Sequence, residues 1–344
     1  MPNAIKYNTS VETLALKKGN FWIGTGDVGK GPTSSTGFYN GITPPSGGYT
    51  IYLNKLSSGP SIYTVTTESQ MVSLTNGIGS QNFTTSGQCL NWFATQTDKM
   101  IFNIDYPNIV TNSLVLNLDA GFTPSYPTTN TTWYDLSSSG NNSELINGPT
   151  FSAVNGGSIV FDGIDDKVSC PASSTIDFTT TDNFSVETFC YATSRSGSGM
   201  IPIVERYYWA TQGKGGYGIR LTNYGSINPL FFITGVVPNV GQTDYAVQAT
   251  TTWVSNTWYH IVGTKNSSGT LKIYINGVLE NISLTDNIIP LTSDDYPLMI
   301  GARGDTRDQY SNSRIGAVRI YRKELTASEV LQNYNAQKSK YGLS

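Results

Sequence analysis

Acidic side chains are the residues of this chain with the most evident chemical potential, because a pair of carboxyl groups can hydrolyse a glycosidic bond. That reaction needs the two groups about 5 Å or about 6.5–9.5 Å apart across the scissile bond. Asp162, Asp165 and Asp166 fall in one glycine-containing turn rather than on one strand face. Glu187 is the lone acidic residue of its predicted strand. The spacing therefore predicts solvated turn carboxylates and a protein that is not an enzyme.

Residue types also argue against two other kinds of active site. The chain has one histidine, His260, so neither a Ser–His–Asp triad nor a histidine-based metal site is expected. We expect His260 in the core or at an interface, on the same strand face as Trp258. Residues 24–29 fit G-x-G-x-x-G, but Gly31 and Pro32 follow Lys30. They cannot begin the helix that a phosphate cradle needs, so this segment predicts a turn.

Aromatic side chains offer a chemistry of binding, since a flat ring matches the apolar face of a sugar. Residues 207–209 are three consecutive aromatics, which cannot all point to one side of a strand. Two more tyrosines lie in predicted loops beside an arginine. We predict a glycan or partner site here, and packing of residues 207–209 against a neighbouring subunit is the alternative. The candidate binding residues are Tyr207, Tyr208, Trp209, Tyr296, Arg303 and Tyr310.

The elements that position these residues are mostly short strands. Apolar residues alternate over residues 114–118, 271–275 and 318–321, which is typical of half-buried strands. Asn276-Gly277 predicts a tight hairpin turn, because both central residues need positive φ. Thr326 and Glu329 form a capping box, which predicts a closing helix over residues 327–337. Many short strands and one terminal helix indicate a mainly β fold, a two-sheet sandwich over residues 113–344.

The first third of the chain has a different pattern. A length of 344 residues suits two domains, at about 100–200 residues each. Capping-box spacing predicts short helices within residues 67–77 and 85–95, and residues 21–23 and 48–53 are strand-like. We interpret residues 1–112 as a small α+β domain that precedes the sandwich.

Three stretches of the second domain carry a family resemblance. They are residues 132–151 followed by 157–170, residues 257–280 (TWYHIVGTKNSSGTLKIYINGVLE) and residues 300–330 (IGARGDTRDQYSNSRIGAVRIYRKELTASEV). They resemble laminin G-like, concanavalin A-like lectin jelly-roll domains, of the type found on tailed-phage (marine and cyanophage) virion structural proteins. The resemblance implies a jelly-roll scaffold over residues 113–344 whose loops or faces bind glycans, proteins or neighbouring copies.

The resemblance also implies a structural calcium ion near the first strand and the loop after it. Hard cations take six to eight oxygen ligands. Asp119, Asp135, Asn141 and Asn142 are the candidate metal ligands, and no other cofactor is expected. Gly316 and Ala317 stand where related domains often carry an acidic residue. Hydrogen-bonded turn residues therefore remain the alternative.

Composition limits the partners. The net charge is −3, and 13% of residues are charged against about 25% in an average protein. Without a basic run, nucleic-acid binding is not expected. No apolar stretch approaches the ~20 residues of a membrane helix, and the first residues lack the apolar core of a signal peptide. The three cysteines allow one disulfide at most, between Cys170 and Cys190, or a reduced chain.

Composition and resemblance together lead us to expect a non-enzymatic virion structural protein. The expected roles are capsid decoration, a head fibre or a tail appendage, made in the host cytoplasm. Its partners would be other virion proteins, host surface polysaccharide and copies of itself, with a trimer favoured. A free-standing glycan-binding lectin is the alternative, and a glycan-active hydrolase is disfavoured.

Overall fold

The computed structural model describes the second part of the chain almost completely. It covers residues 109–344 apart from 123–124, 129, 194–199, 208–214, 225, 238–240, 285–288, 291–295 and 305–308. Before residue 109 it covers six strands and two single residues, Ser73 and Asn82. The chain divides into two compact units, Met1–Thr111 and Asn112–Ser344. Cys89 lies outside the described residues. The two helices expected within residues 67–77 and 85–95 also lie outside them, except for Ser73.

The described part of the first unit consists of antiparallel strands. Four of them form a sheet in the order β1-β6-β4-β5, and β2 pairs with β3. The strands expected over residues 21–23 and 48–53 are both found there, as β3 and β4. The bounds are β1 (Ala4–Tyr7), β2 (Leu16–Lys18), β3 (Phe21–Ile23), β4 (Tyr49–Lys55), β5 (Gly59–Val65) and β6 (Met100–Asn103).

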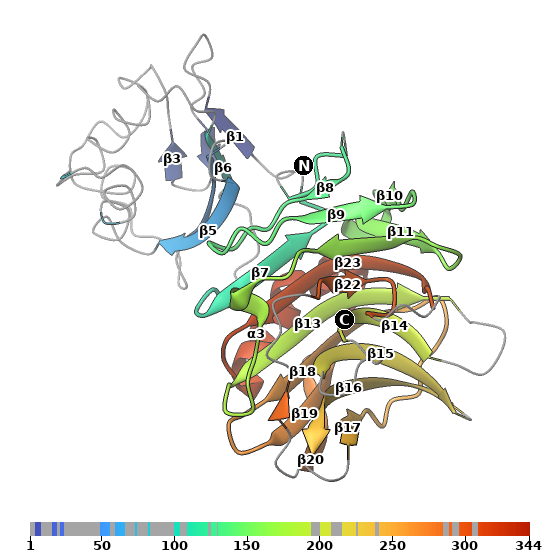
Figure 1. The fold of residues 1–344 in the computed structure, drawn as a ribbon. Helices are drawn as coiled ribbons and strands as arrows, with labels where there is room; N and C mark the ends of the chain where they lie inside the picture. Colours follow the sequence, from blue (N-terminus) through green and yellow to red (C-terminus); the bar gives the residue numbers. More distant parts are fainter. Residues whose placement is uncertain are drawn as a thin grey trace. The chain divides into compact units, whose positions relative to one another are not determined.

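The second unit is a jelly-roll sandwich of two antiparallel sheets, as the sequence predicts. The eight-stranded sheet has the order β10-β11-β23-β13-β18-β19-β20, with β7 also paired to β23. Figure 1 shows β13 and β23 side by side although more than 100 residues separate them. The strands are β7 (Leu114–Asp119), β10 (Thr150–Ser152), β11 (Ser158–Asp162), β13 (Phe184–Ala192), β18 (Trp258–Lys265), β19 (Thr270–Ile275), β20 (Val278–Leu284) and β23 (Asn312–Tyr321).

The second sheet of the sandwich has nine strands. Their order is β17-β16-β15-β14-β22-β12-β9-β8, and β21 pairs with β16. The bounds are β8 (Thr132–Trp133), β9 (Ser143–Ile146), β12 (Lys167–Cys170), β14 (Met200–Arg206), β15 (Gly216–Tyr224), β16 (Ser226–Val237), β17 (Gly241–Gln248), β21 (Ile289–Pro290) and β22 (Leu298–Ile300). The described helices are three 3₁₀ turns and one α-helix: η1 (Val154–Gly156), η2 (Ser174–Ile176), α3 (Ala327–Gln337) and η3 (Lys338–Tyr341).

The main core fills the space between the two sheets. Alternate residues of each strand point into it, among them Ile261 of β18 and Phe231 of β16. The sheets approach most closely at Gly263, where an added Cβ would lie 2.2 Å from the Phe231 ring. Cys170 and Cys190 are buried and unpaired, so the disulfide that the sequence allowed is not formed.

Two local predictions are confirmed at the C-terminal end of the sandwich. Asn276 and Gly277 have φ of 50° and 82°, and they turn β19 into β20. The α-helix spans Ala327–Gln337, and its first turn carries the capping box of Thr326 and Glu329. Both motifs act through neighbouring residues, which is why sequence alone identifies them.

The strands under this helix differ from the half-buried pattern that alternation predicts. All six residues of β7 are buried, as are the last seven of β23. Their outward side chains lie beneath α3 and η3 rather than in water. Phe189, Trp258 and Ala317 of the sheet pack against Tyr334 of α3 and Tyr341 of η3. Trp258 and His260 are buried, as expected.

A charge network lies buried in the same layer. The Arg319 guanidinium donates to Glu187 Oε1 at 2.7 Å, to Gln337 Oε1 at 2.7 Å and to Asn117 Oδ1 at 3.0 Å. Glu187 Oε2 also accepts from Asn333 Nδ2 of α3 at 2.6 Å. Arg319, Glu187, Asn333 and Gln337 are all 0% exposed.

Asp119 extends the network to the end of the chain. Its carboxylate accepts from Gln337 Nε2 at 2.8 Å and pairs with Lys340 Nζ. Two carboxylates, of Asp119 and Glu187, are thus matched by two cations, of Arg319 and Lys340. Burial alone raises the pKa of Glu187, but Arg319 and hydrogen bonds from His260 and Asn333 outweigh it and lower the pKa to about 2. The carboxylate is therefore ionised at neutral pH.

We predict that Glu187→Gln destabilises the protein by about 3–5 kcal/mol, because it leaves the buried Arg319 charge without its counter-ion. Urea unfolding at pH 7 measures the loss. Glu324→Gln is the matched control: it breaks the partly exposed Lys272–Glu324 pair, 2.7 Å apart, and should cost at most ~1 kcal/mol. Equal losses for the two variants would contradict the importance given to the buried pair.

No helix among the described residues is long and apolar enough to cross a membrane.

Candidate functional site

An aromatic and arginine cluster lies on the outer face of the nine-stranded sheet. In β15, Tyr217, Ile219 and Leu221 point into the core, so Arg220 points to the outer face. Its guanidinium carbon lies 3.6 Å from the centroid of the Phe232 ring of β16. It also lies 5.4 Å from the centroid of Tyr207, directly after β14. The Tyr207 and Phe232 rings meet edge to face, 5.5 Å apart.

The loop between β22 and β23 brings a second arginine to this cluster. The Arg303 guanidinium carbon lies 5.5 Å from the Tyr207 ring centroid. Arg303 is held by Gln309, whose backbone oxygen accepts from its N–H at 2.9 Å and whose Oε1 accepts from its Nη1 at 3.2 Å. Ala302 forms a β-bridge with Tyr310. The structure thus brings together Tyr207, Arg303 and Tyr310.

The predicted binding residues differ in exposure. Tyr207 is 1% exposed and Arg303 is 7% exposed, and the guanidinium groups of both Arg220 and Arg303 lie near the Tyr207 ring. Gly304 lies so close to the Tyr207 backbone that an added Cβ would meet its oxygen at 2.4 Å. Tyr310 and Tyr296 are partly exposed. Tyr208 and Trp209 lie outside the described residues.

Sequence reasoning missed three members of the cluster, Glu205, Arg220 and Phe232. Glu205 is 1% exposed, and its Oε1 lies 3.0 Å from Arg220 Nε. The sequence did contain a signal for Glu205. It lies two residues before Tyr207 at the end of β14, so the two side chains point to the same face of the sheet. The described cluster holds one carboxylate and two guanidinium groups beside two aromatic rings. These five side chains are only 1–7% exposed, so they form a buried cationic and aromatic layer rather than an open surface.

The four residues predicted to bind calcium fall into two groups. Asp135 Oδ1 accepts from the N–H groups of Asn117 and Ser137, and Oδ2 accepts from Ser137 Oγ and the Asn141 N–H, all at 2.7–2.8 Å. Asn142 Oδ1 accepts from the Asp135 N–H. Burial raises the pKa of Asp135, and these hydrogen bonds oppose the rise.

Asp119, the fourth predicted ligand, does not take part in the hydrogen bonds of the Asp135 loop. Its carboxylate is engaged with Lys340 and Gln337. Calcium binding by Asp119, Asp135, Asn141 and Asn142 stays a prediction.

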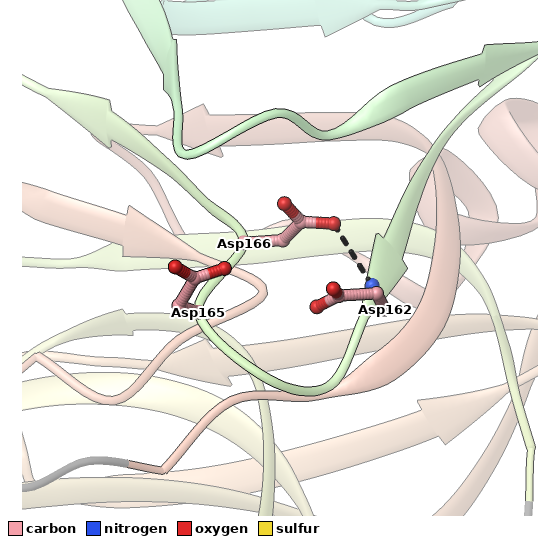
Figure 2. Close-up of side chains that lie close together, drawn as sticks. All are labelled: Asp162, Asp165 and Asp166. Carbon is pink, nitrogen blue, oxygen red and sulfur yellow. Dashed lines mark hydrogen bonds between the residues drawn. The ribbon is translucent and has the colours of Figure 1, made fainter.

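Three carboxylates gather in the turn between β11 and β12. Figure 2 shows Asp162, Asp165 and Asp166, each of which offers one oxygen within 4.8 Å of the other two. Asp166 Oδ2 accepts from the Asp162 N–H at 2.9 Å. Among the described residues, this is the one group of three or more aspartate, glutamate, histidine or cysteine side chains that lie close enough together to hold a metal ion. Burial raises the pKa of Asp166, as do the charges of Asp162 and Asp165.

We predict that Asp165→Asn lowers the pKa of Asp166, because it removes one of the charges that oppose its ionisation. NMR titration of the side-chain carboxyl carbons would follow Asp166 directly. Because the variant removes a like charge from the turn, it should also gain up to about 0.5 kcal/mol of stability at pH 7. Asp177→Asn, a change distant from the turn, should leave the Asp166 titration where it was. An unchanged titration in Asp165→Asn would contradict the repulsion.

Comparison with known proteins finds a family match for part of the sandwich. A family model described as the concanavalin A-like lectin/glucanases superfamily, of the laminin G type, matches residues 161–331. No curated protein sequence matches the chain significantly.

Solved structures share the fold. The binding domain of Paraclostridial Mosquitocidal Protein 1 is 18% identical, with a TM-score of 0.51 over 65% of this chain and 52% of that chain. The binding domain of botulinum neurotoxin serotype G is 18% identical, with a TM-score of 0.50 over 66% and 51%. The chain thus spans about half the length of these structures, and at such identities the likeness shows the fold alone. Residues 161–331 thus match the laminin G type of the concanavalin A-like lectin/glucanases superfamily.

Proposed function

We propose that this chain is a non-catalytic recognition protein that displays its sandwich for adhesion. The observation that carries the proposal is the burial of Glu187, the acidic residue of strand β13. Its carboxylate is fully buried and is bound to Arg319 and Asn333. A glycosidase needs a second carboxyl group across an open site, and Glu187 offers neither access nor a free oxygen.

The chemistry of the Tyr207 cluster supports a glycan as ligand. Guanidinium groups donate several hydrogen bonds in fixed directions, which suits hydroxyl and carboxylate groups of polysaccharides. Gln309, which accepts hydrogen bonds from Arg303, and Tyr310, which pairs with Ala302, are partly exposed. The structurally similar mosquitocidal and botulinum chains are named binding domains, which agrees with a recognition role for this sandwich.

We further propose that the chain belongs to a phage particle. The low charge, the polar surface and the resemblance of residues 113–344 to virion appendage domains support this role. The first unit would attach to a capsid or tail protein, and the sandwich would project toward host polysaccharide. Assembly from several copies would let weak single-site binding act as strong multivalent adhesion.

We predict that the intact chain binds acidic polysaccharide on a glycan array and that Tyr310→Ala weakens this binding at least about tenfold, the loss typical of an aromatic anchor. Tyr191→Ala is the matched control. Tyr191 is also partly exposed and stacks on an arginine, Arg314 at 5.1 Å, but lies on the other sheet. Equal binding by all three proteins would contradict the site. Release of reducing sugar from the array ligands would contradict the non-catalytic assignment.

We predict that antibody against residues 113–344 labels purified phage particles at regular positions in immunogold electron microscopy. Label on heads would indicate decoration, and label on tails or fibres would indicate adhesion. Unlabelled particles, with the protein free in the lysate, would contradict the virion role and leave a free-standing lectin.

A further inference from the structure

The edge strand β20 carries an unusual apolar surface. Eight large apolar side chains are exposed in the described part of the chain. Four of them belong to β20, which has seven residues. Val278, Leu279, Ile282 and Leu284 are 63%, 40%, 51% and 73% exposed. A fifth, Leu331 of α3, is 45% exposed and lies against the Gly277 turn that leads into β20. Such clustering on one element is typical of an interface.

The backbone of this strand is also open along one side. Among the strands that the structure describes, β20 ends its sheet and pairs with β19 alone. Its sequence, VLENISL, has no lysine or proline, which natural edge strands use to prevent pairing with other chains. Three of the exposed side chains share the outer face, because Leu279, Ile282 and Leu284 oppose Tyr274, Lys272 and Thr270 of β19.

The one charge of β20 is already satisfied. Glu280 Oε2 accepts from the N–H of Thr250, from Thr250 Oγ1 and from the N–H of Thr251, at 2.8–2.9 Å. Oε1 accepts from Thr251 Oγ1. These bonds hold the carboxylate against the neighbouring loop, and they help to lower its pKa. No other charge on the strand opposes a second copy of the same surface.

We propose that two copies of this chain associate through β20, in antiparallel register about a twofold axis at Ser283. Directly opposite residues share a face in an antiparallel pair. With Ser283 on the axis, Ile282 of each copy therefore packs on Leu284 of the other. An axis at Ile282 would instead set Glu280 against Leu284. Within the described strand, residues 282–284 of each copy pair with each other and join the two eight-stranded sheets at this edge. This inference is independent of the proposed glycan site.

Cross-linking of the full chain tests the register. A Ser283→Cys variant places two thiols opposite each other at the axis, so mild oxidation should give a reducible dimer. Ile164→Cys is the control, since Ile164 is as exposed as Leu284 but lies in the turn after β11. The unaltered chain shows the background from its native cysteines. Failure of Ser283→Cys to exceed that background would overturn the register.

Light scattering with size-exclusion chromatography tests the dimer itself. We expect twice the chain mass for the unaltered protein, and a dissociation constant at least about tenfold higher for Ile282→Lys. Ile164→Lys should remain dimeric, and circular dichroism should show all three folded. A monomer at every concentration, or a trimer or dimer that Ile282→Lys leaves intact, would overturn the proposal.

Discussion

The buried pairing of Arg319 with Glu187 and its extension to Asp119 is the interaction on which the sandwich depends. It joins β7, β13 and β23 to α3 and η3, and so ties the first strand of the unit to its last residues. A buried ion pair adds little net stability compared with apolar packing, but a single buried charge left alone costs several kcal/mol. Moving α3 by one turn would separate Asn333 and Gln337 from their partners. The network therefore fixes where the helix lies.

The packing of α3 and η3 over the eight-stranded sheet determines which surfaces a ligand could reach. Over the centre of the eight-stranded sheet, the helix and the rings of Tyr334 and Tyr341 occupy the outer face. No ligand can reach Glu187 or His260 there, because both are fully buried. The nine-stranded sheet instead presents Arg220, Phe232 and Tyr207 on its outer face, and the β22–β23 loop adds Arg303. These four side chains are themselves only 1–7% exposed, so the binding site that we propose would depend on the partly exposed Gln309 and Tyr310 next to Arg303.

Sequence reasoning succeeded where neighbouring residues decide the outcome. The helix at 327–337 and the Asn276-Gly277 turn depend on contacts within a few residues. It was wrong about the exposure of β7 and β23, because the cover is a tertiary contact: Gln337 of α3 bonds to Asp119 of β7, 218 positions away, and no local pattern shows that α3 folds back over β23. Tyr207 was expected at the surface for the same reason, since no local pattern reveals that Arg220 and Arg303 will lie over its ring.

The burial of these arginines bears on how the face would recognise a ligand. A surface arginine loses considerable side-chain entropy when it binds, whereas Arg220 and Arg303 are already held by Phe232, Glu205, Gln309 and the Tyr207 ring. Folding has already ordered these two side chains. A ligand that bound them would therefore interact with fixed positive charges without a further loss of side-chain entropy. In the binding site that we propose, the partly exposed Tyr310, which pairs with Ala302 next to Arg303, would contact the ligand directly. Such preorganisation suits a protein that binds through many weak copies, because each site must bind without rearrangement.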